Sequence, residues 1–133
     1  MTINEDPAQQ VIRYVREAHT ALSRAYMQLQ TGPHRRSKQE RELQRALYRA
    51  HVAAASASVA MAGRHLETYP DLHMMHASVA EDVTGLKMNK TPTGALIHPI
   101  LAARVINILN TKLVTYMSMA AREPCYLPHT AMA

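Results

Sequence analysis

Phenylalanine and tryptophan are absent from this chain of 133 residues, and cysteine occurs once, at Cys125. The single cysteine excludes a disulfide within the chain. Only four glycines interrupt the sequence, whereas alanine, leucine, valine, isoleucine and nine methionines supply the apolar content. Alanine and methionine favour helix, and a hydrophobic content of 47% is enough for a packed core. The composition therefore predicts a single all-α domain.

Long uncharged stretches are also lacking. The most apolar region, residues 97–121, is interrupted by Arg104 and Lys112, so we do not expect it to span a bilayer. The first ten residues carry acidic side chains where an export signal would carry basic residues and then an apolar run. We therefore expect a cytoplasmic or otherwise intracellular protein that does not enter a membrane.

Motifs for catalysis are missing as well. The four isolated glycines form neither a P-loop nor a dinucleotide fingerprint, and there is no Gly-x-Ser-x-Gly motif. His73 and His76 are three residues apart and could share a metal ion, but neither Glu-x-x-His nor His-Glu-x-x-His occurs. We predict a protein that is not an enzyme, has no metal site and needs no cofactor.

Capping signals and apolar spacing predict four helices. Asp6 and Ser37 each precede a Gln or Glu by three residues, as in the capping box that begins a helix. Gly32-Pro33 ends the first helix, and Gly85 is expected to end the third. The expected helices cover residues 7–31, 38–66, 71–84 and 98–122, with a tail at 123–133. Together they form one domain over residues 1–133.

The two long helices each carry an apolar series at alternating four- and three-residue steps, which is heptad spacing. In the first helix the series is Val11, Val15, Ala18, Leu22, Ala25 and Leu29. In the second helix it is Leu43, Leu47, Ala50, Ala54, Ala57 and Met61. A short loop joins the two helices, so the sequence predicts an antiparallel four-helix bundle built on this hairpin, with a short third helix.

The expected fourth helix has apolar residues around most of its circumference and one narrow polar stripe. So wide an apolar surface needs cover on several sides. Either the helix is central within the bundle, or a second chain covers it. We therefore predict self-association. The candidates for a subunit contact or for the central core are Leu101, Val105, Ile108, Leu109 and Leu113.

Positive charge is concentrated in one segment. Between His34 and His51 there are six basic and two acidic residues, whereas the rest of the chain is nearly balanced. Arg41, Arg45 and Arg49 follow one another at four-residue steps, where like charges repel. We expect this row to face away from the heptad series of the same helix and to meet an anion.

Three interpretations of the basic segment stay open. It is an ordinary solvated helix face, a contact for an acidic protein surface, or a sequence-independent contact for the phosphate backbone of nucleic acid. Helix-turn-helix spacing, zinc-finger cysteines and aromatic stacking residues are lacking, which favours an acidic protein. The candidate contacts are Arg35, Arg36, Lys38, Arg41, Arg45 and Arg49.

Overall fold

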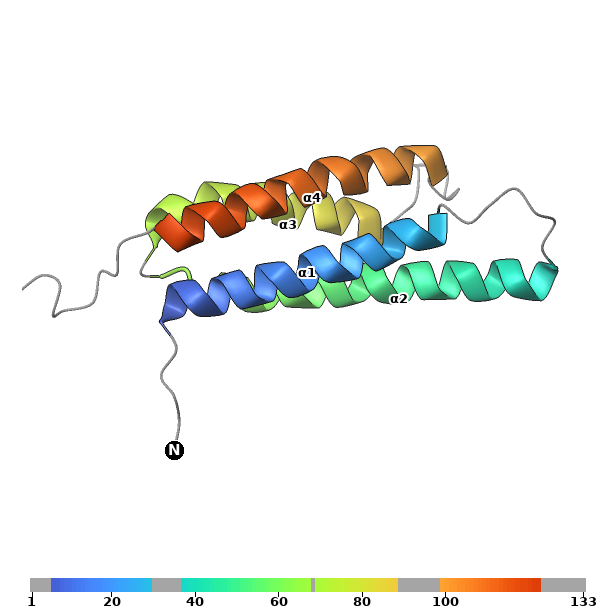
Figure 1. The fold of residues 1–133 in the computed structure, drawn as a ribbon, viewed down its shortest axis with the longest axis horizontal. Helices are drawn as coiled ribbons and strands as arrows, with labels where there is room; N and C mark the ends of the chain where they lie inside the picture. The colour runs from blue at the N-terminus through green and yellow to red at the C-terminus, as the bar shows by residue number, and fades with distance from the viewer. Residues whose placement is uncertain (1–5, 30–36, 68, 89–98, 123–133) are drawn as a thin grey trace, which may run out of the picture.

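The structure, a computed structural model, describes residues 6–29, 37–67, 69–88 and 99–122. It contains the helices α1 (Pro7–Leu29), α2 (Lys38–Gly63), α3 (His73–Met88) and α4 (Pro99–Arg122). One turn of 3-10 helix, η1 (Pro70–Leu72), leads into α3. The described residues contain no strand, and the helices form the antiparallel bundle that the sequence predicts (Figure 1).

The four helices pack around a square. α1 lies along α2 and α4, and α3 lies along the same two helices from the other side. Within the described residues the diagonal pairs, α1 with α3 and α2 with α4, do not pack against each other. α3 is the shortest helix and covers only part of the length of α2 (Figure 1).

The two predicted helix starts are confirmed. The Asp6 carboxylate accepts the backbone N–H of Ala8 at 3.2 Å, and the Ser37 hydroxyl accepts that of Glu40 at 3.1 Å. These bonds satisfy amides that have no partner within the helix. The Tyr69 hydroxyl also donates to Asp6, at 2.8 Å, and so ties the start of α1 to the segment before α3.

The predicted helix ends are partly confirmed. α2 ends at Gly63, three residues before the expected end at residue 66. The prediction that Gly85 ends the third helix is wrong, because α3 continues to Met88. Glycine inside a helix costs about 1 kcal/mol relative to alanine, and burying the leucine that follows, Leu86, offsets this. The expected stop at Gly32-Pro33 and the tail at 123–133 lie outside the described residues.

The core uses the predicted face of α1. Val11, Val15, Ala18, Leu22 and Ala25 are buried. They belong to the same buried cluster as Ile106, Leu109, Leu113 and Tyr116 of α4, the helix that packs along α1. The heptad spacing of the first helix therefore identified its inward face.

The prediction that the heptad series of the second helix packs into the core is wrong. Leu43 is 61% exposed and Leu47 is 38% exposed. The alanines that follow in that series are exposed too. The buried residues of α2 are instead Tyr48, Val52, Ala55, Val59 and Ala62. We call these residues the inner face of α2. They share the same four- and three-residue steps, but include a tyrosine and two valines that fill the space between helices better than alanine does.

Candidate partner-binding surface

The first part of α2 extends beyond the end of α1. The Gln44 side chain donates a hydrogen bond to the backbone carbonyl of Gln28 at 2.7 Å, so the end of α1 lies beside Gln44. Residues 37–47 are all exposed except Gln44, which is half-buried. Figure 1 shows this end of α2 projecting past both α1 and α3. The projecting segment has solvent on nearly every side.

Arg41 and Arg45 of the arginine row lie on this projecting segment, and Arg49 lies just beyond it, next to the buried Tyr48. Arg41 and Arg45 stand seven residues before Tyr48 and Val52, so they continue the inner face of α2. They are exposed because the bundle ends, and not because they point away from the core. The row faces away from the heptad series and is exposed, as expected, but that series lies on the exposed side of α2 and not on its packed side.

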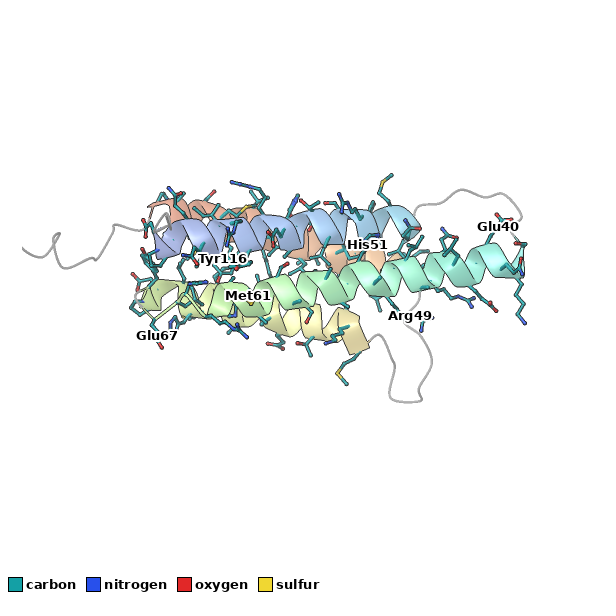
Figure 2. The ribbon with its side chains drawn as sticks, turned by 90° about the horizontal axis from the view of Figure 1, so that it is seen from below. Glu40, Arg49, His51, Met61, Glu67 and Tyr116 are labelled. Carbon is teal, nitrogen blue, oxygen red and sulfur yellow. The ribbon has the colours of Figure 1, made fainter. Side chains whose placement is uncertain are left out.

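Arg49 continues the row towards α3. It stands two heptads before Gly63, which faces the ring of His76 in α3. Figure 2 shows Arg49 on the side of α3, beyond the end of that helix, and His51 on the opposite side, towards α1. The row thus begins in line with the core and turns towards the place where the short α3 stops.

The three guanidinium groups have no partner among the residues that the structure describes. No hydrogen bond or ion pair joins Arg41, Arg45 or Arg49 to another described side chain. Their backbone positions span eight residues, or about 12 Å of helix. Lys38 is exposed at the start of the same helix. Arg35 and Arg36 lie outside the described residues.

Lys112 of α4 provides a contrast. Its ammonium group donates to the Asp82 carboxylate at 2.7 Å and to the Ser78 hydroxyl at 2.8 Å. Both side chains of the ion pair are about one third exposed or less. A cation that serves the fold therefore has acceptors on a neighbouring helix, which the arginine row does not.

The five apolar candidates of α4 fall on different sides of that helix. Leu109 and Leu113 are fully buried within the bundle, and Val105 is half-buried against the core. Leu101 and Ile108 are 52% and 58% exposed. Leu109 and Leu113 cannot be reached from solvent, so of the five candidates only Leu101 and Ile108 are well exposed for a subunit contact.

Both histidines considered as metal ligands make hydrogen bonds within the chain. His73 donates from Nε2 to the Leu66 carbonyl, and His76 Nδ1 lies 2.9 Å from the Tyr116 hydroxyl. Burial, with a smaller contribution from His73, lowers the pKa of His76 below its usual value. Among the described residues there is no group of three side chains that could hold a metal ion.

An open hollow between α1 and α2 is a feature that the sequence did not indicate. Its volume is about 350 Å³. Its lining residues are Arg16, Glu17, Thr20, Ala21 and Arg24 of α1 and His51, Ala54 and Ser58 of α2. They come from two helices, so only the relative rotation of the helices brings them together. The hollow lacks the enclosed apolar walls that are typical of a small-molecule site.

The fold is an all-α four-helix bundle from which the first part of α2 projects. No protein-family model, curated protein or solved structure matches the chain. None of the helices in the described part is long and apolar enough to cross a membrane. The function must therefore be argued from the surface chemistry of the bundle.

Proposed function

We propose that this chain is a non-enzymatic interaction protein that assembles with itself and binds an acidic protein surface through Arg41, Arg45 and Arg49. The observation that carries this proposal is the placement of the arginine row. Arg41 and Arg45 lie on a helix end that projects from the bundle, Arg49 is exposed next to it, and no acidic side chain of the described residues pairs with the row. Charge-assisted hydrogen bonds from guanidinium to carboxylate are among the stronger polar contacts that a surface can make.

The row suits an acidic helix in particular. Arginines at four-residue steps repeat about every 6 Å along α2, and carboxylates at four-residue steps on another helix repeat at the same distance. Because like charges at this spacing repel, a matching row of carboxylates removes a cost that α2 carries alone. Arg41 and Arg45 continue the inner face, so a partner helix there would lie in line with the helices of the bundle.

Two features favour a protein over nucleic acid as the partner. Glu40 and Glu42 are exposed in the same segment and oppose a continuous phosphate backbone. Residues 38–47 also contain no aromatic side chain on which a base could stack. Binding to nucleic acid through the same arginines is the alternative, and the experiment below separates the two.

The test compares two charge-matched variants of the full chain. One replaces Arg41, Arg45 and Arg49 with Gln, and the other replaces Arg16, Arg24 and Arg104, which are exposed on α1 and α4. Binding to polyglutamate is measured by calorimetry at low and at physiological salt. Three exposed ion pairs of about 0.5 kcal/mol each predict that the first variant binds about tenfold more weakly. The control should bind nearly as wild type does.

The same titration with a mixed-sequence DNA duplex decides between the partners. The proposal expects weaker binding to the duplex than to polyglutamate at equal salt. Tighter binding to the duplex, lost in the variant of the arginine row, would replace the proposal with the nucleic-acid alternative. Equal losses in both variants would show that only net charge matters, and would remove the row as a specific contact.

A further inference from the structure

The second apolar face of α2 is exposed along the whole helix. We call it the outer face of α2. It contains Glu40, Leu43, Leu47, Ala50, Ala54, Ala57 and Met61, and Arg64, the residue directly after α2, continues it. These residues follow one another at alternating three- and four-residue steps, and only Met61 is partly covered. A heptad series over eight positions is typical of a helix that packs against another helix, and not of single exposed leucines on a surface.

We propose that the outer face of α2 binds the same face of a second copy of this chain, with the two helices antiparallel. This inference rests on the self-association in the proposed function and identifies its surface. In an antiparallel pair, the positions of the two heptad series face each other in layers. A twofold axis that passes through the contact at the level of residue 52 pairs the positions of the two helices. It places Glu40 opposite Arg64, Leu43 opposite Met61, Leu47 opposite Ala57, and Ala50 opposite Ala54.

The sizes of the side chains fit this register. The alanines meet at the centre, and each leucine of the projecting segment meets a residue nearer the other end of the partner helix. The flanking positions on one side are Ala46, Ala53 and Ala60, all exposed. Small side chains at the centre and on one flank allow the two helix axes to approach closely. The pairing would cover Leu43 and Leu47, which are among the exposed large hydrophobic residues of the described chain.

Charge complementarity selects the antiparallel arrangement. In the register above, the exposed Glu40 of each copy faces the exposed Arg64 of the other, so both ends of the contact carry opposite charges. A parallel pair would instead place glutamate against glutamate at one end and arginine against arginine at the other. The flanking positions Gln44 and Ser58 carry no charge, so they do not oppose the pairing.

The proposed contact leaves the arginine row accessible. The row begins on the inner face, on the other side of α2 from Leu43 and Leu47. In an antiparallel dimer the two projecting ends point in opposite directions, and each would present one row. One helix would thus assemble the protein through its apolar side and bind the acidic partner through its basic side.

The first test is the mass of the protein in solution. Sedimentation equilibrium of the full chain should show a dimer that dissociates on dilution. Replacing Leu43 and Leu47 with Lys should leave the monomer mass at concentrations where the wild type is dimeric. Circular dichroism should show unchanged helicity, because both side chains are exposed in the single chain. A wild-type protein that stays monomeric up to millimolar concentration would overturn the proposal.

The second test examines the register. Glu40→Arg and Arg64→Glu should each weaken the dimer about tenfold, because two ion pairs become two repulsions. The double variant restores opposite charges and should return to within about threefold of wild type. Two weakened single variants with no recovery in the double variant would contradict this antiparallel register.

Failure of this inference can be told apart from failure of the proposed partner contact. The variant of the arginine row should keep the dimer mass. The Leu43→Lys and Leu47→Lys variant should still bind polyglutamate, chain for chain. Loss of the dimer in the arginine variant would show that the outer face alone does not make the contact, and would overturn the inference.

Discussion

The inner and outer faces of α2 have the same residue spacing but differ in their exposure to solvent. The inner face is buried between α1 and α3, and the outer face is exposed. Tyr48, Val52 and Val59 give the inner face more volume than the central alanines give the outer face. Spacing thus shows that a helix has an apolar face, whereas side-chain volume decides which face enters the core.

The inner face also differs between its two ends. From Tyr48 onwards its residues are buried, but the equivalent positions one heptad earlier are Arg41 and Arg45. Leu43 and Leu47 occupy the outer face of that same projecting segment. The change from tyrosine and valine to arginine marks the place where the bundle stops and the projecting segment begins.

The largest expected effect comes from a charge on each face. Val59→Asp places a carboxylate where the valine is only 3% exposed, and should lower the free energy of unfolding by more than about 3 kcal/mol. Ala57→Asp on the outer face should cost less than about 1 kcal/mol, mainly from helix propensity. Urea unfolding of dilute protein measures both. Similar losses would contradict the assignment of the two faces.

A smaller effect on stability is expected at Gly63, where α2 ends beside α3. A methyl group added at Gly63 would lie 2.8 Å from His76 Nε2, so Gly63→Ala must shift this ring, which also contacts the Tyr116 hydroxyl through Nδ1. We expect a loss of about 1 kcal/mol in the free energy of unfolding. With His76→Ala in the background the same substitution should instead stabilise, because alanine favours helix over glycine. Unfolding of the four proteins measures this sign change.

The pH dependence of stability should show a weaker trend. The pKa of His76 is lowered in the folded chain, so the unfolded chain takes up a proton first as the pH falls. This contribution is complete above the unfolded pKa of about 6.5 and is lost as the pH falls towards the folded pKa. Urea midpoints between pH 7.5 and 5 should decline less in His76→Gln. Identical slopes would show that His76 is not responsible.

The smallest effect is expected for truncating Leu43 on the outer face, and a leucine of the core provides the contrast. Leu22→Ala in the core of α1 should cost about 3 kcal/mol, because a cavity replaces a fully buried side chain. Leu43→Ala on the outer face should change the free energy of unfolding by less than about 0.5 kcal/mol in dilute protein. A large loss at Leu43 under those conditions would mean that the single chain covers it.

Much of the fold could be predicted from local signals. Asp6 and Ser37 cap helices because their side chains reach amides a few residues away, and such contacts can be read from sequence. The buried face of α1 followed from its single apolar series. The end of α3 was missed at Gly85, because the burial of Leu86 depends on neighbouring helices. α2 was misassigned because two faces had equivalent spacing.

The candidate surface was predicted only in part. The exposure of Arg41, Arg45 and Arg49 could be expected from charge alone. The position of Arg41 and Arg45 in line with the core could not, because it depends on where α1 and α3 end. The His76–Tyr116 pair joins two residues that are 40 positions apart in the sequence. The hollow beside His51 depends on how α1 and α2 are rotated relative to each other. No local pattern carries that information.

Thiol labelling of single cysteines tests the account of α2 most directly. In a Cys125→Ser background, one set of variants carries cysteine at Ala50 or Ala57, and the other carries it at Val52 or Val59. In dilute protein the outer-face thiols should react as fast as an unfolded peptide, and the inner-face thiols only through unfolding. Raising the protein concentration should slow the outer-face thiols alone. Fast labelling at Val52 and slow labelling at Ala50 in dilute protein would contradict the account.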